Sequence, residues 1–153
     1  MFRVGLISET HGLLRPAALD FLRGCQRIVH AGDIGDRAIL EALSVIAPVT
    51  AVRGNNDDGE AFADLPEAVT IDLGGTRVYV LHDLKALAID PRAEGVQVVV
   101  SGHSHKPLVE ERQGVLYVNP GSAGRRRFKL PISVGELLID GVQVTVRIVE
   151  LDG

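Results

Sequence analysis

The chain has 153 residues, of which 46% are apolar and 24% charged, and this fits one globular domain spanning residues 1–153. Its net charge of -4 argues against duplex nucleic acid as a partner, because proteins that bind duplexes carry a basic excess or stripe. A single cysteine excludes an intrachain disulfide, and neither a signal-peptide pattern nor a membrane-length apolar run occurs, so we expect a cytoplasmic protein with no membrane partner.

The first third of the chain alternates predicted strands and helices. Short apolar runs typical of buried strands occupy 4–7, 27–30 and 48–53. Between them, 16–22 begins with Pro16 near N1, and 36–46 begins with Asp36 as an acidic N-cap and carries apolar residues at helical spacing. This order predicts a parallel sheet with crossover helices.

After residue 65 the pattern changes to paired strands around short turns. The turns are Gly74-Gly75, Gln113-Gly114 and Asp140-Gly141, and they join the predicted strand pairs 69–73 with 77–81, 108–112 with 115–118, and 132–139 with 142–149. A further buried strand is predicted over 96–100. Hairpins following a βαβ half predict two stacked mixed sheets with helices outside.

The one basic run is Arg125-Arg126-Arg127, with Lys129 close behind. It could contact a single phosphate group or an acidic partner, or it could be a solvated loop. The mean hydropathy of +0.19 is high for a small chain and is compatible with a homo-oligomer.

All five histidines follow predicted strands. Each lies at or just after the carboxyl end of a strand, where open α/β sheets place their ligand sites, and the five are His11, His30, His82, His103 and His105. Such joint placement is improbable for histidines that only pack. We expect His30 to be the exception, a packed or supporting residue.

Oxygen donors accompany these histidines. Glu9 stands two residues before His11, and alternate residues of an extended segment point the same way. Asp33 follows a glycine after the second strand, and its two oxygens could bridge two ions; Asn55 follows the third strand. The seven candidate metal ligands are therefore Glu9, His11, Asp33, Asn55, His82, His103 and His105.

This donor set predicts the kind of cofactor. Mixed oxygen and nitrogen donors without thiolate suit manganese, iron, zinc or nickel better than calcium. Seven ligands are too many for one tetrahedral site and about right for two ions that share a carboxylate. We therefore expect two divalent metal ions, with Mn²⁺ the first choice and Fe, Zn or Ni the alternatives.

The ordered motifs resemble those of a known family. Glu9-x-His11, Gly32-Asp33, Gly54-Asn55-x-Asp57, His82 and Gly102-His103-Ser104-His105 are similar to the motifs of the calcineurin-like metallophosphoesterase superfamily. Asn119-Pro120-Gly121-Ser122 resembles its small bacterial and archaeal phosphodiesterase branch. The resemblance runs to about residue 140 and implies an α/β fold, a four-layer αββα sandwich of two mixed β-sheets flanked by helices.

The resemblance also implies a role for each residue. Glu9, His11, Asp33 and His105 would hold the first ion, and Asp33, Asn55, His82 and His103 the second. Asn55 would help to orient the phosphate, and Asp57 would order the loop that carries Asn55. Asp33, Asn55 and Asp57 are thus the residues assigned to catalysis.

Three positions depart from the family pattern. Glu9 stands where aspartate is usual, which could reshape the first site. Asn56 stands where larger relatives carry a histidine as general acid, and this favours phosphodiesters or activated leaving groups. Asp83 replaces a glycine after His82 and adds charge and bulk beside the second site.

The function expected from these residues is hydrolysis of a small phosphate ester, a nucleotide-like phosphodiester being one candidate, by a metal-bridging hydroxide. The alternative is a binding scaffold that keeps the fold and has lost the chemistry. Retention of Asp33 and of four metal-position histidines favours the enzyme, and only Glu9 favours the scaffold.

Overall fold

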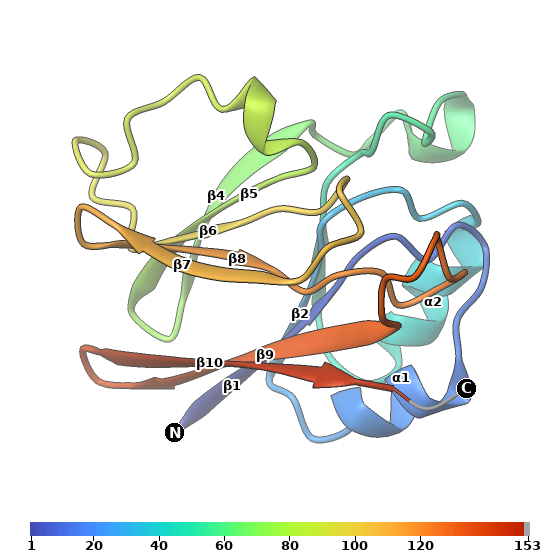
Figure 1. Ribbon diagram of the computed structural model, residues 1–153, viewed down its shortest axis with the longest axis horizontal. Coiled ribbons are helices and arrows are strands. Elements are labelled where there is room, and N and C mark those ends of the chain that lie inside the picture. The colour runs from blue at the N-terminus through green and yellow to red at the C-terminus, as the bar shows by residue number, and fades with distance from the viewer. Residues whose placement is uncertain (152–153) are drawn as a thin grey trace.

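The computed structural model describes residues 1–151, and within them two five-stranded sheets lie face to face (Figure 1). The predicted pair of mixed sheets is confirmed. None of the described helices is long and apolar enough to cross a membrane.

The first sheet has the strand order β10-β9-β1-β2-β3. Strands β1 (Phe2–Ile7), β2 (Arg27–His30) and β3 (Val49–Ala51) are parallel to one another, as the βαβ pattern predicts. The hairpin of β9 (Ser133–Asp140) and β10 (Gln143–Glu150) adds to the other side of β1 in antiparallel pairing.

The second sheet has the order β4-β5-β6-β8-β7. Its three inner strands, β5 (Thr76–Leu81), β6 (Val98–Val100) and β8 (Val115–Asn119), are parallel. Strands β4 (Ala68–Leu73) and β7 (Leu108–Arg112) are the edge strands of this sheet. Each pairs antiparallel with its neighbour, β5 or β8, through a predicted hairpin.

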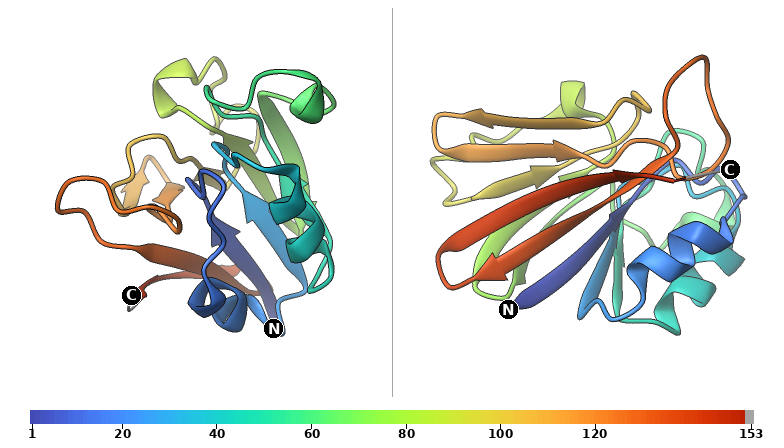
Figure 2. Two further views of the ribbon diagram at one scale, coloured as in Figure 1. Left: turned by 90° about the vertical axis from the view of Figure 1, so that its right-hand side faces the viewer. Right: turned by 60° about the horizontal axis from the view of Figure 1, so that its bottom comes forward.

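The two outer layers of the sandwich differ. Helices α1 (Pro16–Leu22) and α2 (Arg37–Ser44) pack on the outer face of the first sheet (Figure 2), and the Asp36 side chain caps α2 by accepting from the Ala38 amide at 2.9 Å. The outer face of the second sheet is covered by the 3₁₀ turn η2 (Leu84–Ala86) and neighbouring residues such as Leu87 and Ile89. A second 3₁₀ turn, η1 (Glu60–Phe62), follows β3.

Apolar side chains from both sheets fill the space between them. The inner faces contribute chiefly valines and leucines, among them Val4, Leu6, Val78, Val98 and Leu137. These positions alternate along their strands, and their burial fixes the register of each strand. Within each sheet the parallel pairing aligns the carboxyl ends of the parallel strands at one edge of the sandwich.

Candidate metal centre

The loops that follow the parallel strands converge at this edge. Backbone hydrogen bonds join them: the Glu9 amide donates to the Gly32 carbonyl at 3.1 Å, and the His11 amide to the Asp33 carbonyl at 2.9 Å. The Gly102 amide in turn donates to the His82 carbonyl at 2.9 Å. These hydrogen bonds hold residues that are far apart in sequence beside one another.

The backbone conformation of the candidate ligands differs from the extended one that we expected. Of the seven non-glycine residues with positive φ among residues 1–151, five are candidate ligands, namely Glu9, His11, Asp33, His103 and His105. Each left-handed residue costs about 1–3 kcal/mol, and such conformations concentrate at functional sites. The side chains therefore converge through tight left-handed turns and not through the alternation of an extended strand.

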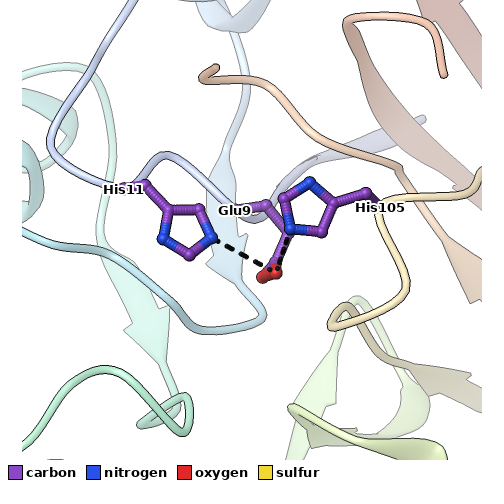
Figure 3. Close-up of side chains that lie close together, drawn as sticks. All are labelled: Glu9, His11 and His105. Atoms are coloured by element: carbon purple, nitrogen blue, oxygen red, sulfur yellow. Dashed lines mark ion pairs between the residues drawn. The ribbon is translucent and has the colours of Figure 1, made fainter. Parts of the chain in front are cut away.

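A first group of donors surrounds the Glu9 carboxylate, which is fully buried. His105 Nε2 lies 3.0 Å and His11 Nε2 lies 3.5 Å from Glu9 Oε1 (Figure 3). Asp33 Oδ2 lies 3.6 Å from the same His11 nitrogen. The first group thus consists of the Glu9 carboxylate, the imidazoles of His11 and His105, and one oxygen of Asp33.

A second group of donors lies on the other side of Asp33. His82 Nε2 is 3.3 Å from Asp33 Oδ2, 2.9 Å from Asn55 Oδ1 and 3.3 Å from His103 Nδ1. Ligands about 2.1 Å from an octahedral ion lie about 3.0 Å from one another, so these spacings suit a shared cation. Asp33 Oδ2 belongs to both groups.

Hydrogen bonding leaves these donor atoms free for a cation. The Nδ1–H of His82 donates to the Ala31 carbonyl at 2.8 Å, so Nε2 is the ring nitrogen directed at the oxygens of Asn55 and Asp33. Burial opposes protonation of this ring, but its hydrogen bonds to Asp33 and Ala31 raise the pKa of His82. Both Glu9 oxygens, His11 Nε2 and both ring nitrogens of His105 are buried without a hydrogen-bond partner. Buried polar groups are normally satisfied, so this convergence fits divalent metal ions.

Electrostatics keep two of the donors ready to bind a cation. Burial alone would raise the pKa of Asp33, but hydrogen bonds from His82 and the Asn56 amide lower it to about 2. Burial, together with the charges of His11 and Arg127, lowers the pKa of His105 to about 4. At neutral pH Asp33 is therefore anionic and His105 is an uncharged imidazole with a free lone pair.

Asp57 contacts the backbone and not the candidate ligands. Its fully buried carboxylate accepts from the Ile34 amide at 2.9 and 3.0 Å, from Gly35 at 3.1 Å and from Gly54 at 2.9 Å. It therefore ties the loop that carries Asp33 to the loop that carries Asn55.

His30 lies beneath the site with no exposed surface. The Gly32 amide donates to its Nδ1 at 3.1 Å, so its Nε2–H donates to the Thr10 hydroxyl at 3.0 Å, and that hydroxyl donates to the Ile34 carbonyl at 2.8 Å. Burial lowers the pKa of His30 to about 3, so the ring is neutral. It supports two ligand-bearing loops, as expected of a residue outside the ligand set.

Glycines permit the close approach of these loops. A Cβ at Gly54 would lie 2.2 Å from both the amide and Oδ1 of Asp33, and one at Gly32 would lie 2.6 Å from His82 Nδ1. Neither position has room for a side chain. The Gly-Asp and Gly-Asn pairs in the sequence are therefore requirements of the packing around Asp33.

Three supporting side chains carry no sequence-based assignment. The Asn119 amide donates to the Gly102 carbonyl at 2.9 Å and to Ser104 Oγ at 3.1 Å, which fixes the loop bearing His103 and His105. Ser122 Oγ donates to the Glu9 carbonyl at 3.3 Å. Asn56 donates to Asp33 through its backbone at 2.9 Å and its side chain at 3.3 Å. The Asn-Pro-Gly-Ser motif is the feature of the sequence that could have pointed to Asn119 and Ser122.

The Glu9 carboxyl gives a prediction for the metal-free protein. Burial raises its pKa from 4.5 to about 8, with His82 opposing the shift and Asp33 adding to it. The folded state therefore binds a proton that the unfolded state releases between these values, so folding stability falls as pH rises from 4.5 to about 8.

We expect Glu9→Gln, which cannot ionise, to lack that decline. Urea unfolding of the EDTA-treated proteins at a series of pH values checks this, because subtracting the variant removes the contribution of most other titrating groups. Parallel pH profiles for the two proteins would contradict the assignment of a proton to Glu9.

The fold and the donor groups together define an α/β sandwich built around a divalent-metal centre. The chain belongs to the calcineurin-like phosphoesterase superfamily, whose domain model matches residues 2–141. Membership supports a metal-dependent hydrolase, in agreement with the resemblance seen in the motifs.

Comparisons with individual proteins agree with this family. The chain is 32% identical to a probable metallophosphoesterase of Methanothermobacter thermautotrophicus over 95% of its length and 91% of the relative's. It is also 32% identical to one of Methanocaldococcus jannaschii, over 78% of this chain and 67% of that one.

Among solved structures, an archaeal phosphodiesterase superposes with a TM-score of 0.81 at 22% identity, covering 98% of this chain and 100% of that one. Vps29 of Chaetomium thermophilum superposes with a TM-score of 0.80 at 20% identity, covering 99% and 97%. At these identities the likeness shows the fold alone.

Proposed function

We propose that this protein is a cytoplasmic phosphodiesterase that uses two divalent metal ions, preferably Mn²⁺. Glu9, His11, Asp33 and His105 would hold one ion, and Asp33, Asn55, His82 and His103 the other. The observation that carries the proposal is the convergence of buried acceptor atoms, with Asp33 Oδ2 common to both groups.

The side chains of this centre would act by position and charge. When bound, the two ions supply a water of lowered pKa as nucleophile and offset the charge of the phosphate. Asp33 stays anionic between the two groups because hydrogen bonds lower its pKa. Asn55, with its Oδ1 committed to the second group, keeps an amide N–H₂ that can donate to a phosphate oxygen.

Two features favour a diester over a monoester. Cavities of about 600 and 380 Å³ flank the centre, and Asp83 lines both, which gives room for an ester group on each side of one phosphorus. Asn56 stands where larger relatives carry a histidine that acts as general acid. Its side-chain amide donates to Asp33 and has no labile proton to give to a poor leaving group.

Hydrolysis of two p-nitrophenyl substrates tests the proposal. After EDTA treatment and reconstitution with Mn²⁺, we expect the bis(p-nitrophenyl) diester to be cleaved at least tenfold faster than the monoester, because only the diester can use both cavities. Activity should disappear in EDTA and return with metal. Equal rates in EDTA and in Mn²⁺ would contradict the proposal, and faster cleavage of the monoester would contradict the diester preference.

A binding scaffold is the second candidate, favoured by the structural likeness to Vps29, a vacuolar protein sorting protein. The two candidates differ in metal content. Elemental analysis after reconstitution and gel filtration should give about two ions per chain for the enzyme, whereas fewer than one would favour the scaffold.

A further inference from the structure

The larger cavity beside the metal centre combines four apolar side chains with charged and polar ones. Leu84, Leu108, Leu130 and Phe128 form the apolar walls, and His103, a candidate ligand of the second ion, also lines it. An ester group on this side of the phosphorus would therefore lie in the cavity. Pockets that bind organic ligands combine such apolar walls with a few charged groups.

Phe128 is the unusual residue of this cavity. Its side chain is 84% exposed and its φ is +55°, a conformation that is strained for a bulky side chain. Of the seven non-glycine residues with positive φ within 1–151, five are candidate ligands, Gln113 belongs to a hairpin turn, and Phe128 is the other. Phe128 lies in a turn that the Leu130 amide closes on the Arg127 carbonyl at 3.2 Å, and burial does not explain why a phenyl ring is held there.

Two cations accompany the ring. Arg127 and Lys85 both line the cavity, and the Arg127 guanidinium lies 5.7 Å from the centre of the Phe128 ring. The chain as a whole has a net charge of -4, so this local positive pair is a departure from the average surface. It suits an anionic ligand, and Asp83 is the opposing charge.

We propose that this cavity binds a nucleoside-type ester group of the phosphodiester substrate. The planar base would stack on Phe128, and Arg127 and Lys85 would attract the negative charge of the phosphodiester. The proposal rests on the function proposed above and names its substrate class. Aromatic side chains recognise any base by its face, so the cavity would select nucleotides without selecting one base.

A binding experiment tests this independently of catalysis. The chain has no tryptophan, so Phe128→Trp introduces the sole indole of the protein. Adenosine 5′-monophosphate should quench its fluorescence in a saturable manner, whereas ribose 5-phosphate and inorganic phosphate should not, because they have no base to stack. The matched control is Val142→Trp in the β9–β10 turn, where the parent side chain is 92% exposed.

The same titration in EDTA separates this proposal from the proposed function. Saturable quenching should persist without metal, with weaker affinity, because the base and not the metal makes the contact with the ring. Equal quenching of both indoles, or none by adenosine 5′-monophosphate, would overturn the nucleoside cavity even if diester hydrolysis were established.

A kinetic comparison gives the second readout. Two diesters share a p-nitrophenyl leaving group and differ in the other ester group, which is thymidine 5′-yl in one and methyl in the other. Phe128→Ala should raise the KM of the thymidine ester about tenfold or more and that of the methyl ester by a much smaller factor, whereas Val142→Ala should change neither. A matching rise for both esters, or for neither, would overturn the proposal.

Discussion

Asp33→Asn should reduce hydrolysis of bis(p-nitrophenyl) phosphate by about 10³-fold or more and lower metal content below two ions per chain. Asp33 Oδ2 lies 3.6 Å from His11 Nε2 and 3.3 Å from His82 Nε2, so it contacts a histidine of each donor group. An amide at this position keeps the size of the side chain but loses its charge, and its N–H₂ cannot ligate a cation.

The matched control is Asp36→Asn, three residues along the same loop. Asp36 is exposed and caps α2, and asparagine is an equally good N-cap, so this variant should keep both activity and stability. Circular dichroism of both variants checks that the fold is intact. Undiminished turnover by Asp33→Asn at full metal loading would remove Asp33 from the mechanism.

Most of the fold was predictable because its signals are local. The helix over 16–22 and the three hairpins agree with the structure closely, since Pro16, the turn glycines and short β-branched runs restrict the backbone near their own positions. The cover over the second sheet is a 3₁₀ turn and irregular segments, in which Leu84 and Leu87 pack against the sheet without a longer helix forming.

The candidate site was predictable in composition and not in geometry. The seven donors could be named because each follows a strand end, and the structure brings all seven together. The left-handed backbone at five of them could not be foreseen, because glutamate rarely adopts it and histidine and aspartate do so only at a minority of positions. It is imposed by hydrogen bonds between loops distant in sequence, such as that from the Glu9 amide to Gly32.

Glu9 illustrates how geometry changes the interpretation of a sequence departure. Glutamate in place of the usual aspartate suggested a weakened first site. Its carboxylate nevertheless lies fully buried, with Oε1 3.0 Å from His105 and Oε2 3.7 Å from His82. Glu9 has a left-handed backbone, and with it the longer side chain still brings its carboxylate to the two histidines. The substitution alone therefore does not favour the scaffold.

Asp57→Asn should have the largest effect on stability, lowering the free energy of unfolding by about 3 kcal/mol. The Asp57 carboxylate accepts from three backbone amides, at Ile34, Gly35 and Gly54, and is fully buried. In the variant one oxygen becomes an N–H₂ that faces amide donors, so hydrogen bonds to a charged acceptor are replaced by a buried clash of donors.

Thermal unfolding of the metal-free variant should show a decrease of about 6–12 °C for a domain of this size. The control is Asp58→Asn, whose exposed parent side chain neighbours Asp57, and it should unfold like the wild type. An Asp57→Asn protein with the unfolding temperature of that control would contradict the role of the carboxylate.

The same substitution should also weaken metal binding by about 10- to 100-fold, the usual cost of losing a group that orients ligands. Asp57 holds Ile34 and Gly35 beside Asp33 and holds Gly54 beside Asn55, so both loops of the second donor group depend on it. Titration with Mn²⁺ below the unfolding temperature separates this effect from instability. Unchanged Mn²⁺ affinity in a destabilised variant would mean that the remaining contacts, such as that of His82 with Ala31, suffice to position the donors.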